Sequence, residues 1–372
     1  MTRPLKLVAA NDTFAALLAV GEVLAGRQAL FVTAPEVNGL MPEVHGLPSD
    51  VDDSVAVIVE SSGSTGTPKR IELSTEALVA SATAAHNRLG GPGQWLLALP
   101  INFVAGLNVL VRSLVAETQP ILMNATLPFT ADGFARAASL MTGERRYTSL
   151  VPTQLERLAR ELPFNDFLLA QLRRFDAILV GGQAVNPATL RDLRAAGVNV
   201  VETYGMTETC GGCVYDGKAL DGVAVRLADD GSIVIAGPTL CNSAAESGEF
   251  VTSDRGEFDA DGRLLVLGRA DRVIASGGIK LSLDRVEQFA ATVVGVTEVA
   301  ATALADPEWG QRVGIAYVGS PEVADSIAQS LAETLGPAGK PVRVIRVDKL
   351  PKLASGKPDL IATANLFEES RG

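Results

Sequence analysis

The sequence predicts an α/β protein with a large domain built on a mostly parallel sheet, a small β subdomain, and a small mobile α+β domain. Two observations carry this prediction. Short apolar runs such as residues 55–59 and 177–180 alternate with longer Ala- and Leu-rich stretches, which is typical of buried parallel strands joined by helices. From about residue 222 the pattern changes to short strand-like runs separated by Gly and Asp, which favours a small twisted sheet.

The large domain begins with a helix that is capped near Asn11 and stops at Gly26. Further strands of this domain are expected at residues 55–59, 95–99, 119–123, 177–180 and 199–201. Helices are expected at residues 75–89 and between the strand at 95–99 and about residue 115. Because the carboxyl ends of parallel strands meet at one edge of a sheet, we expect the loops that follow these strands to carry function.

A domain boundary is expected close to residue 270, which divides the chain into a domain of residues 1–269 and a domain of residues 270–372. The small β subdomain before this boundary is expected to use strands at 224–227, 232–235 and 263–267. The second domain is expected to contain a helix at 284–291, strands at 296–304 and 312–318, and a helix at 321–335.

The charge balance excludes two broad classes of function. With 32 basic and 43 acidic residues the net charge is −11, whereas general binders of nucleic acid or anionic membranes depend on clustered Lys and Arg. The two histidines, His45 and His86, are too few for most histidine-based metal sites and for most Ser–His–Asp chemistry. A site for a small polyanion therefore has to supply its positive charge locally.

No membrane span is expected. The most apolar stretch, residues 103–116, is shorter than the roughly 18 residues of a span and is interrupted by Asn108 and Arg112. Residues 14–20 imitate the core of a signal peptide, but the polar pair at residues 11–12 stands where that core should run. A cytoplasmic location is therefore expected.

Three cysteines are too few for a disulfide framework and indicate a reducing compartment. Cys210 and Cys213 have the C-x-x-C spacing of redox and zinc sites. They follow a Gly-rich turn instead of a strand–helix start, and no second pair completes a zinc site. A structural role is therefore favoured over a redox or metal site.

The strongest local signal is the segment 61–69, which directly follows the strand at 55–59. Small hydroxyl residues and two glycines let backbone N–H groups approach phosphate oxygens closely, and Lys69 adds a positive charge. The spacing is not that of a Walker A loop, because Pro68 stands where the second glycine belongs and Arg70 where Ser or Thr belongs. The segment predicts a phosphate-binding loop in place of an ordinary surface loop.

Five motifs resemble those of the adenylate-forming superfamily of acyl-CoA synthetases, adenylation domains and luciferases, and they follow in the family's order. They correspond to the phosphate loop (62–69), the adenine-and-magnesium motif (203–209), the ribose-binding segment (250–254 with 261–262), the hinge motif (268–271 with 276–280) and the catalytic-lysine motif (350–357). Coincidence does not explain five motifs in order.

The resemblance implies a two-step reaction with ATP, Mg²⁺ and CoA. A carboxylate attacks the α-phosphate and expels pyrophosphate, and the CoA thiol then displaces AMP. Lys357 is implied to stabilise the charge that develops in the first step, Thr207 to direct a hydroxyl toward the α-phosphate, and Glu208 to bind Mg²⁺. The residues implied to bind ATP or AMP are Ser62, Gly63, Ser64, Thr65, Gly66, Lys69, Gly182, Gln183, Thr203, Tyr204, Gly205, Asp254 and Arg269.

The resemblance also implies residues for domain motion, CoA and the acid. Asp271 is implied as the hinge about which the second domain swings between the two steps. The implied CoA path contains Gly277, Gly278 and Lys280, and the implied acid contacts are Asn102, Phe103, Gly106 and Gly181. Family members commonly carry a histidine in the segment that holds Asn102, and this sequence lacks it.

Residues 149–154 and 203–217 are most similar to o-succinylbenzoate–CoA ligases of menaquinone biosynthesis, and the short length resembles their compact actinobacterial-type members. About 60 residues precede the phosphate loop, where larger relatives have well over a hundred, so the N-terminal part of the large domain is expected to be truncated.

Other readings stay open. A different aryl- or acyl-CoA ligase, or a stand-alone adenylation enzyme that loads a carrier protein, would keep the same motifs. A non-catalytic binding protein is disfavoured, because five residues that the chemistry needs are all present: Lys69, Glu208, Asp254, Arg269 and Lys357. The expected partners are a small carboxylic acid, ATP and CoA, without nucleic acid or membrane. The sequence does not fix the oligomeric state, and a homodimer is among the options.

Overall fold

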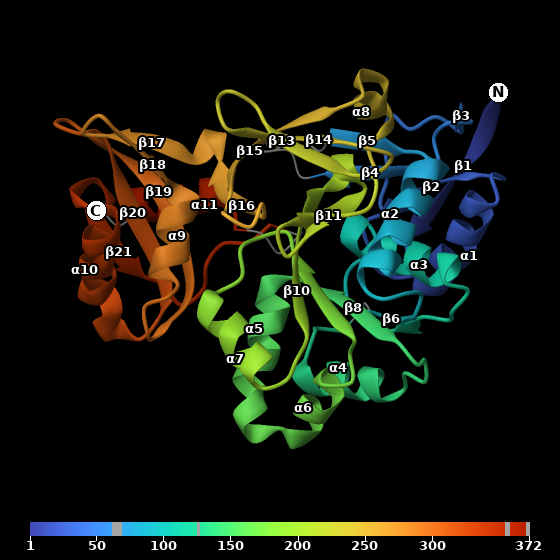
Figure 1. Ribbon diagram of the computed structural model, residues 1–372, viewed down its shortest axis with the longest axis horizontal. Helices are drawn as coiled ribbons and strands as arrows, with labels where there is room; N and C mark the ends of the chain where they lie inside the picture. Colours follow the sequence, from blue (N-terminus) through green and yellow to red (C-terminus); the bar gives the residue numbers. More distant parts are fainter. Residues whose placement is uncertain (62–68, 125–126, 354–357, 370–372) are drawn as a thin grey trace. The chain divides into compact units, whose positions relative to one another are not determined.

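The computed structural model describes residues 1–61, 69–124, 127–353 and 358–369. The chain divides into two compact units (Figure 1). The first comprises Met1–Val185, Thr189–Arg226 and Val234–Phe250, and the second comprises Asn186–Ala188, Leu227–Ile233 and Val251–Gly372. Both units combine helices with sheets, so the predicted α/β class is confirmed.

A five-stranded mixed sheet lies in the N-terminal part of the first unit. Its strands are β1 (Thr2–Ala9), β2 (Ala29–Thr33), β3 (Asp50–Asp52), β4 (Val57–Ser61) and β5 (Lys69–Leu73), in the order β3-β1-β2-β4-β5. Strands β1, β2 and β4 run parallel, whereas β3 and β5 pair antiparallel at the edges. Helix α1 (Thr13–Leu24) joins β1 to β2, and the Asp12 carboxylate caps it by accepting from the Ala15 N–H.

A seven-stranded sheet forms the centre of the first unit. Its strands are β6 (Gln94–Leu97), β7 (Ile121–Leu122), β8 (Arg146–Leu150), β9 (Ala177–Gly181), β10 (Val200–Met206), β11 (Gly211–Tyr215) and β12 (Lys218–Ala219), in the order β12-β11-β10-β9-β8-β6-β7. Strands β10, β9, β8, β6 and β7 pair in parallel, and β11 and β12 add antiparallel partners at one edge.

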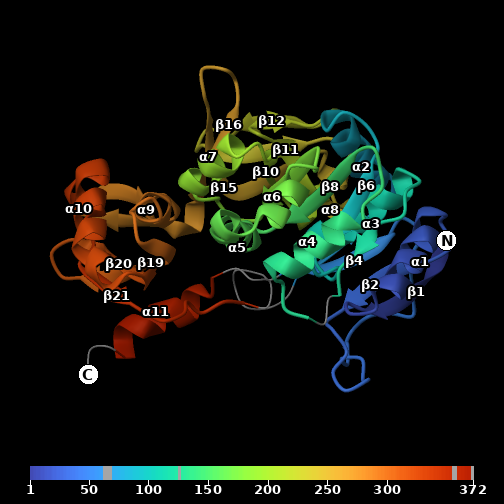
Figure 2. The ribbon, with the colours of Figure 1, turned by 90° about the horizontal axis from the view of Figure 1, so that it is seen from below.

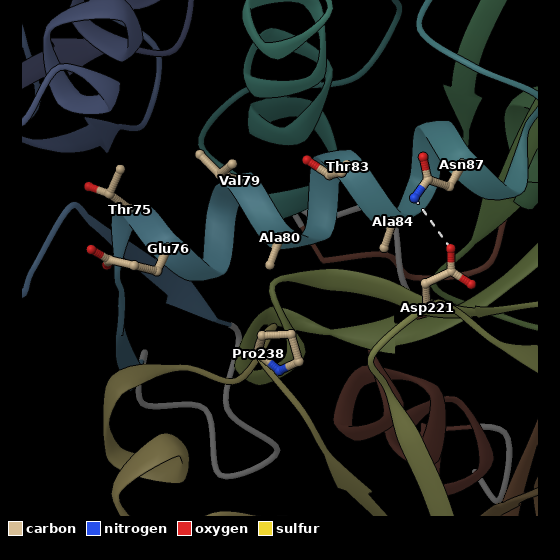
Figure 3. Close-up of a pocket in the computed structure, with 9 residues that line it drawn as sticks. All are labelled: Thr75, Glu76, Val79, Ala80, Thr83, Ala84, Asn87, Asp221 and Pro238. Atoms are coloured by element: carbon tan, nitrogen blue, oxygen red, sulfur yellow. Dashed lines mark hydrogen bonds between the residues drawn. The ribbon is translucent and has the colours of Figure 1, made fainter.

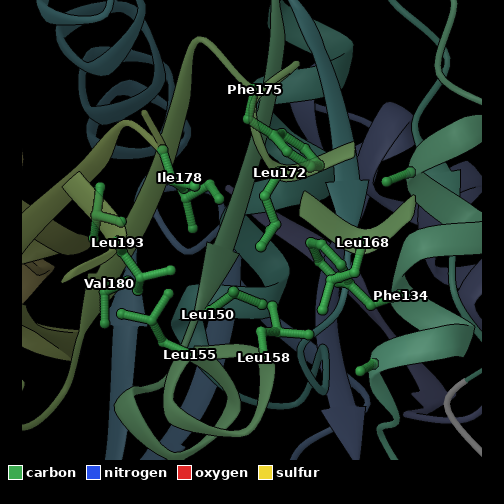
Figure 4. Packing of buried hydrophobic residues seen from close by; sticks show 14 of the residues in the cluster. Phe134, Leu150, Leu155, Leu158, Leu168, Leu172, Phe175, Ile178, Val180 and Leu193 are labelled. Atoms are coloured by element: carbon green, nitrogen blue, oxygen red, sulfur yellow. The ribbon is translucent and has the colours of Figure 1, made fainter. Parts of the chain in front are cut away.

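Helices pack on both faces of this sheet. They are α2 (Thr75–Arg88), α3 (Val104–Val115), α4 (Ala131–Ser139), α5 (Pro152–Glu161) with the short η1 (Leu162–Phe164), α6 (Asp166–Leu172) and α7 (Pro187–Ala195). Helix α8 (Asn242–Ser247) contacts β5 of the five-stranded sheet instead. Leu96 of β6 belongs to the buried cluster that includes residues of α4 to α7. Figure 4 shows part of this cluster, with Phe134 and Leu155 among the labelled residues. Trp95, the neighbour of Leu96, points the other way and contacts His86 of α2 and Arg112 of α3.

A four-stranded sheet follows in the chain, with strands β13 (Ala224–Leu227), β14 (Ser232–Ala236), β15 (Phe250–Phe258) and β16 (Leu264–Arg269) in sequential order. The predicted small β region is therefore present. Strand β15, the longest of the four, is absent from the predicted elements, because its polar residues 252–255 do not alternate with apolar ones.

The C-terminal part of the second unit is an α+β structure around a further sheet, in the order β18-β17-β20-β19 with β21 on β20. Its elements are η3 (Ala270–Arg272), β17 (Val273–Ser276), β18 (Ile279–Ser282), α9 (Leu283–Ala290), β19 (Val296–Asp306), β20 (Gly310–Gly319), η4 (Pro321–Val323), α10 (Ala324–Leu335), η5 (Pro337–Gly339), β21 (Arg343–Arg346) and α11 (Leu360–Glu369). One apolar cluster joins α9 and α10 to the sheet, and a separate cluster joins α11 to it. Figure 2 shows α11 beside the strands of this sheet and apart from α9 and α10. None of the described helices combines the length and apolar character that crossing a bilayer demands.

Candidate active site

Strands β9 and β10 bring Gly181 and Thr203 together near the carboxyl edge of the parallel sheet. The two residues are register partners, and the Thr203 hydroxyl donates to the Val180 carbonyl at 3.2 Å. A Cβ atom on Gly181 would lie 2.4 Å from Thr203 Oγ1, so the close strand contact requires glycine there. Gly182 follows at φ +88°, a left-handed conformation that favours glycine, and Gln183 is half-buried beside it.

The motif at residues 203–209 lies inside β10 and the short turn η2 (Thr207–Thr209), so the strand predicted at 199–201 is longer than expected. A bulge between Tyr204 and Gly205 shifts the register with β11. A Cβ atom on Gly205 would lie 2.1 Å from the Gly211 carbonyl oxygen. The glycine therefore lets the strand continue where a larger residue would push β11 away.

The turn after η2 is held by side chains from two helices. Cys210 has a left-handed φ of +54°, and its carbonyl accepts from Asn108 Nδ2 at 2.7 Å and from Ser81 Oγ at 3.1 Å. Sequence reasoning did not place Asn108 or Ser81 in the site. The available signal was Asn108 itself, a polar residue inside an apolar helical run.

Glu208 stands in η2 with its side chain half-buried. Its backbone carbonyl accepts from the Cys241 N–H at 2.8 Å, and its carboxylate makes no ion pair with the described residues. A carboxylate that is held by its backbone and not neutralised by a neighbour suits a hard cation such as Mg²⁺. The donor chemistry therefore fits the metal that the motif implies.

Lys69 begins β5 and is exposed. Strand β5 contacts η2, which brings the strand that starts at Lys69 to the turn that carries Glu208. The remaining predicted phosphate-loop residues lie outside the described residues, namely Ser62, Gly63, Ser64, Thr65 and Gly66.

Three of the four predicted acid contacts lie where β6 leads into α3, whereas the fourth, Gly181, ends β9. Asn102 and Phe103 are half-buried, and Phe103 is the N-cap residue of α3 in an extended conformation. Gly106 is buried, and a Cβ atom on it would lie 2.2 Å from the Pro100 carbonyl oxygen. The first turn of α3 can therefore approach Pro100 only because residue 106 is glycine.

Arg112 is the one Lys or Arg side chain that is fully buried in the described part of the chain, with 3% exposure. Its guanidinium lies 5.0 Å from the Trp95 ring centroid, and Nη2 donates to the Tyr215 hydroxyl at 3.2 Å. Its Nε has no hydrogen-bond partner, and no carboxylate of the described residues pairs with it. Sequence reasoning missed this buried cation, although it too interrupts the apolar run.

The thiols of Cys210 and Cys213 are buried and unpaired. Burial raises the pKa of Cys210 to about 12 and that of Cys213 to about 11. Redox thiols work as thiolates in electropositive, accessible surroundings. The surroundings of these two thiols therefore support the structural role that the sequence favoured.

In the second unit, Asp254 and Arg269 are register partners on β15 and β16. Arg269 also makes a bidentate ion pair with Asp271, with Nε–Oδ1 and Nη2–Oδ2 distances of 2.8 and 2.6 Å. This hydrogen bonding raises the pKa of Arg269 and lowers the pKa of Asp271. The predicted ribose residues and the predicted hinge residue therefore form one charged group.

Helix α9 anchors this group. The Arg269 N–H donates to Asp284 Oδ2 at 2.6 Å, and Asp284 also accepts from Arg272. Arg272 donates to both carboxylate oxygens of Glu287 at 2.7 and 3.0 Å and to the Ala301 carbonyl at 2.9 Å. Burial raises the pKa of Glu287 against the opposing effect of Arg272. The residues on both sides of Asp271 are thereby tied to one helix.

The predicted CoA-path residues form the hairpin between β17 and β18. Gly277 and Gly278 are its two turn residues, at φ +58° and +81°, as a two-residue hairpin turn of this kind requires. A Cβ atom on Gly277 would lie 2.7 Å from the Trp309 ring. Lys280 is exposed on β18, and Lys357 lies outside the described residues.

A groove of about 610 Å³ runs along α2 in the first unit (Figure 3). In it, Asn87 Nδ2 donates to Asp221 Oδ2 at 3.3 Å. Its lining residues are Thr75, Glu76, Val79, Ala80, Thr83, Ala84, Asn87, Asp221 and Pro238. None of the predicted site residues lines this groove, so it is not the candidate active site.

Two family models match the chain. The AMP-binding enzyme family matches residues 17–245, and the C-terminal domain of AMP-binding enzymes matches residues 285–357. The chain belongs to the AMP-binding enzyme family. The resemblance that the five motifs predicted is thereby confirmed.

Similar proteins agree with this membership. A probable 2-succinylbenzoate–CoA ligase of Mycobacterium tuberculosis is 39% identical over 98% of both chains. A 2-succinylbenzoate–CoA ligase of Lactococcus lactis is 29% identical and covers 82% of this chain and 70% of its own length.

Two similar solved structures share the fold. The amide bond synthetase McbA of Marinactinospora thermotolerans superimposes with a TM-score of 0.77 at 22% identity, over 98% of this chain and 90% of its own. The o-succinylbenzoate CoA synthetase MenE of Bacillus subtilis, in complex with the acyl-adenylate OSB-AMP, superimposes with a TM-score of 0.73 at 23% identity, over 96% of this chain and 82% of its own.

Proposed function

We propose that this AMP-binding enzyme is an ATP-dependent 2-succinylbenzoate–CoA ligase of menaquinone biosynthesis. The observation that carries the proposal is the 39% identity, over 98% of both chains, to the probable ligase of M. tuberculosis. Solved structures of B. subtilis MenE include a complex with the adenylate OSB-AMP and a complex with ATP and a magnesium ion. They support ATP, Mg²⁺ and CoA as the ligands of this chain.

In the first step, the substrate carboxylate attacks the α-phosphate, and pyrophosphate leaves. Residues 203–208 and Lys69 are assigned to hold the nucleotide, with the Thr207 hydroxyl directed at the α-phosphate. Mg²⁺ on Glu208 would neutralise phosphate charge. Lys357 is assigned to stabilise the charge that develops between the carboxylate and the phosphate, as a fixed cation and not as a base.

In the second step, the CoA thiol attacks the acyl carbon and AMP leaves. We assign the domain boundary to the bond between residues 269 and 270, and the hinge to Asp271. The domain of residues 270–372 would then present Lys357 in the first step and Gly277–Gly278 in the second step. The glycine turn supports this role, since missing side chains allow a pantetheine arm to pass closely.

The acid itself supplies a further argument. 2-Succinylbenzoate carries two carboxylates, and the one that is not activated needs a cation in a site that excludes water. Arg112 is a buried guanidinium without a carboxylate partner among the described residues, and it lies one helical turn beyond Asn108. We assign Arg112 to bind the ring carboxylate, because its planar fork matches a carboxylate in bidentate fashion.

A cytoplasmic location belongs to the same proposal. The three cysteines are buried and unpaired, as in proteins of reducing compartments.

The test is a pyrophosphate-release assay with ATP and Mg²⁺ across a panel of carboxylic acids, with and without CoA. We expect turnover with 2-succinylbenzoate that requires CoA and yields its thioester. Turnover with a different acid would keep the reaction and reject the substrate. Release of pyrophosphate with no transfer to CoA would favour the enzyme that loads a carrier protein.

A further inference from the structure

An ion pair lies next to the segment that carries Lys357. The Lys352 ammonium group donates to Glu298 Oε1 at 2.8 Å. The two side chains are only 25% and 30% exposed. Partial shielding from water makes such a pair stronger than a fully exposed one.

Backbone contacts join the two ends of the same segment. Lys352 and Pro358 form an isolated antiparallel bridge, and the Asp359 N–H donates to the Pro351 carbonyl at 3.0 Å. The residues that flank positions 354–357 are thus fixed to each other. The Lys352–Glu298 ion pair connects them in turn to the sheet of the second unit.

Glu298 lies on β19 at a place where the ladder is irregular. The register with β20 shifts between Val296 and Glu298, so Thr297 is the extra residue of a bulge, and its hydroxyl donates to the Val318 carbonyl at 3.0 Å. Bulges change the direction in which the next side chain points. Lys352 is the cation that pairs with the Glu298 carboxylate.

We propose that Glu298 is a positioning residue for adenylation. Through Lys352 it holds the described residues on both sides of the segment that carries Lys357, namely Pro351–Lys352 and Pro358–Asp359. This inference rests on the proposed function, in which Lys357 serves the first step and not the second. If the Lys352–Glu298 ion pair only stabilised the fold, its loss would lower the rates of both steps equally.

The test compares Glu298→Gln and Lys352→Met with Lys349→Met as a matched control, since Lys349 is an exposed lysine in the same segment. We expect adenylation by the first two variants to fall about 10- to 100-fold, because small misplacements of a catalytic group cost that much. Thioester formation from supplied 2-succinylbenzoyl-adenylate should stay within about twofold of wild type. The double variant Glu298→Lys/Lys352→Glu should recover most of the adenylation, and the control should keep all of it.

Hydrogen exchange at the Asp359 amide gives a readout that needs no substrate. We expect faster exchange in Glu298→Gln than in Lys349→Met, because the anchor of the Pro351–Asp359 hydrogen bond is weakened. Equal loss of both half-reactions, or failure of the charge-exchanged variant to recover, would overturn the proposal. If the wild-type enzyme forms no adenylate, the proposed function fails, and hydrogen exchange alone tests the Glu298–Lys352 ion pair as an anchor. Faster exchange of the Asp359 amide in Glu298→Gln would support the anchor, and unchanged exchange would reject it.

Discussion

Asn108 and Cys210, 102 residues apart in the chain, are joined by a 2.7 Å hydrogen bond from the Asn108 side-chain amide to the Cys210 carbonyl. Asn108 is 2% exposed on α3, and Cys210 ends the turn that carries Thr207 and Glu208. Because Cys210 adopts a left-handed conformation, its carbonyl has left the regular ladder and needs a donor from elsewhere. Helix α3 therefore fixes the turn on which the proposed magnesium ligand stands.

Asn108→Ala should lower both stability and turnover. Losing a buried hydrogen bond costs about 1–3 kcal/mol of unfolding free energy, with Ser81 as the remaining donor to the Cys210 carbonyl. The turn then loses its tie to α3, so the adenylation rate should fall by more than the loss of folded protein explains. Urea unfolding and pyrophosphate release measure the two effects.

Ser113→Ala is the matched control on the same helix. Ser113 is fully buried, and its hydroxyl donates to the Val109 carbonyl at 2.7 Å within α3. Its loss should change stability without changing the turnover of folded enzyme. Equal turnover in the two variants would contradict a positioning role for Asn108.

Elements with a strong apolar period were predictable from the sequence. The helix expected at 75–89 is α2 (Thr75–Arg88), and the strand expected at 224–227 is β13. Helical period and strand-like runs are local properties of the chain, so no knowledge of packing is needed to detect them.

Elements whose stability comes from partners elsewhere were not predictable. Strand β1 carries Arg3, Pro4 and Lys6, and it exists because β2 and β3 pair with it. The motif at 203–209 was expected after a short strand, yet the bulge at Gly205 lets β10 continue through it.

The same limit applied to the site. The motif residues carry a local signature, whereas Asn108, Arg112 and Glu298 acquire their proposed roles only from residues about 50 to 100 positions away, namely Cys210, Tyr215 and Lys352. For Asn108 and Arg112, the sole local signal in the sequence was a polar residue inside an apolar run.

Two helical glycines should respond to alanine with opposite signs. Gly21 lies in α1, and apart from its chain neighbours and the backbone of its own helix no atom of the described residues lies within 4 Å of an added Cβ, so Gly21→Ala should stabilise the protein by about 0.5–1 kcal/mol. On Gly106 the same Cβ would lie 2.2 Å from the Pro100 carbonyl oxygen, so Gly106→Ala should destabilise by about 1–3 kcal/mol. Thermal unfolding of the two variants checks this. Stabilisation by both would show that α3 has room to move away from Pro100.

Arg112→Met should damage the use of 2-succinylbenzoate selectively. If Arg112 binds the ring carboxylate, its removal should lower kcat/KM for 2-succinylbenzoate about 100-fold, or about 2.7 kcal/mol. The analogue 3-benzoylpropanoate lacks the ring carboxylate and should be used about equally by wild type and variant. Met fills the space beside Trp95 with little loss of stability.

Arg112→Lys separates charge from shape in the same assay. A lysine keeps the positive charge but lacks the planar fork, so it should recover part of the lost activity toward 2-succinylbenzoate. An equal loss with both acids in Arg112→Met would instead mean that Arg112 supports the fold through Trp95 and Tyr215.

His86 should make stability depend on pH. Burial, with a smaller effect of Arg112, lowers the pKa of His86 to about 4 from the ordinary 6.5. Between these two values the unfolded chain binds a proton that the native protein does not bind. Stability is therefore fully present above pH 6.5 and is lost as the pH falls toward 4, by about 2 kcal/mol between pH 7.5 and pH 5.

His86→Gln removes that proton from the unfolded chain, so the difference in unfolding free energy between pH 7.5 and pH 5 should shrink by about 2 kcal/mol. Urea unfolding at both pH values measures it. The other histidine, His45, has a side chain that is 82% exposed, and its 3.8 Å contact with the equally exposed Glu43 carboxylate is of a kind that contributes little to stability. His45→Gln should therefore leave the difference as it is in wild type. If the difference in unfolding free energy between the two pH values is the same in His86→Gln as in wild type, His86 is not a buried neutral imidazole in the folded protein. A group whose pKa is ordinary in both the folded and the unfolded state adds no pH dependence to stability.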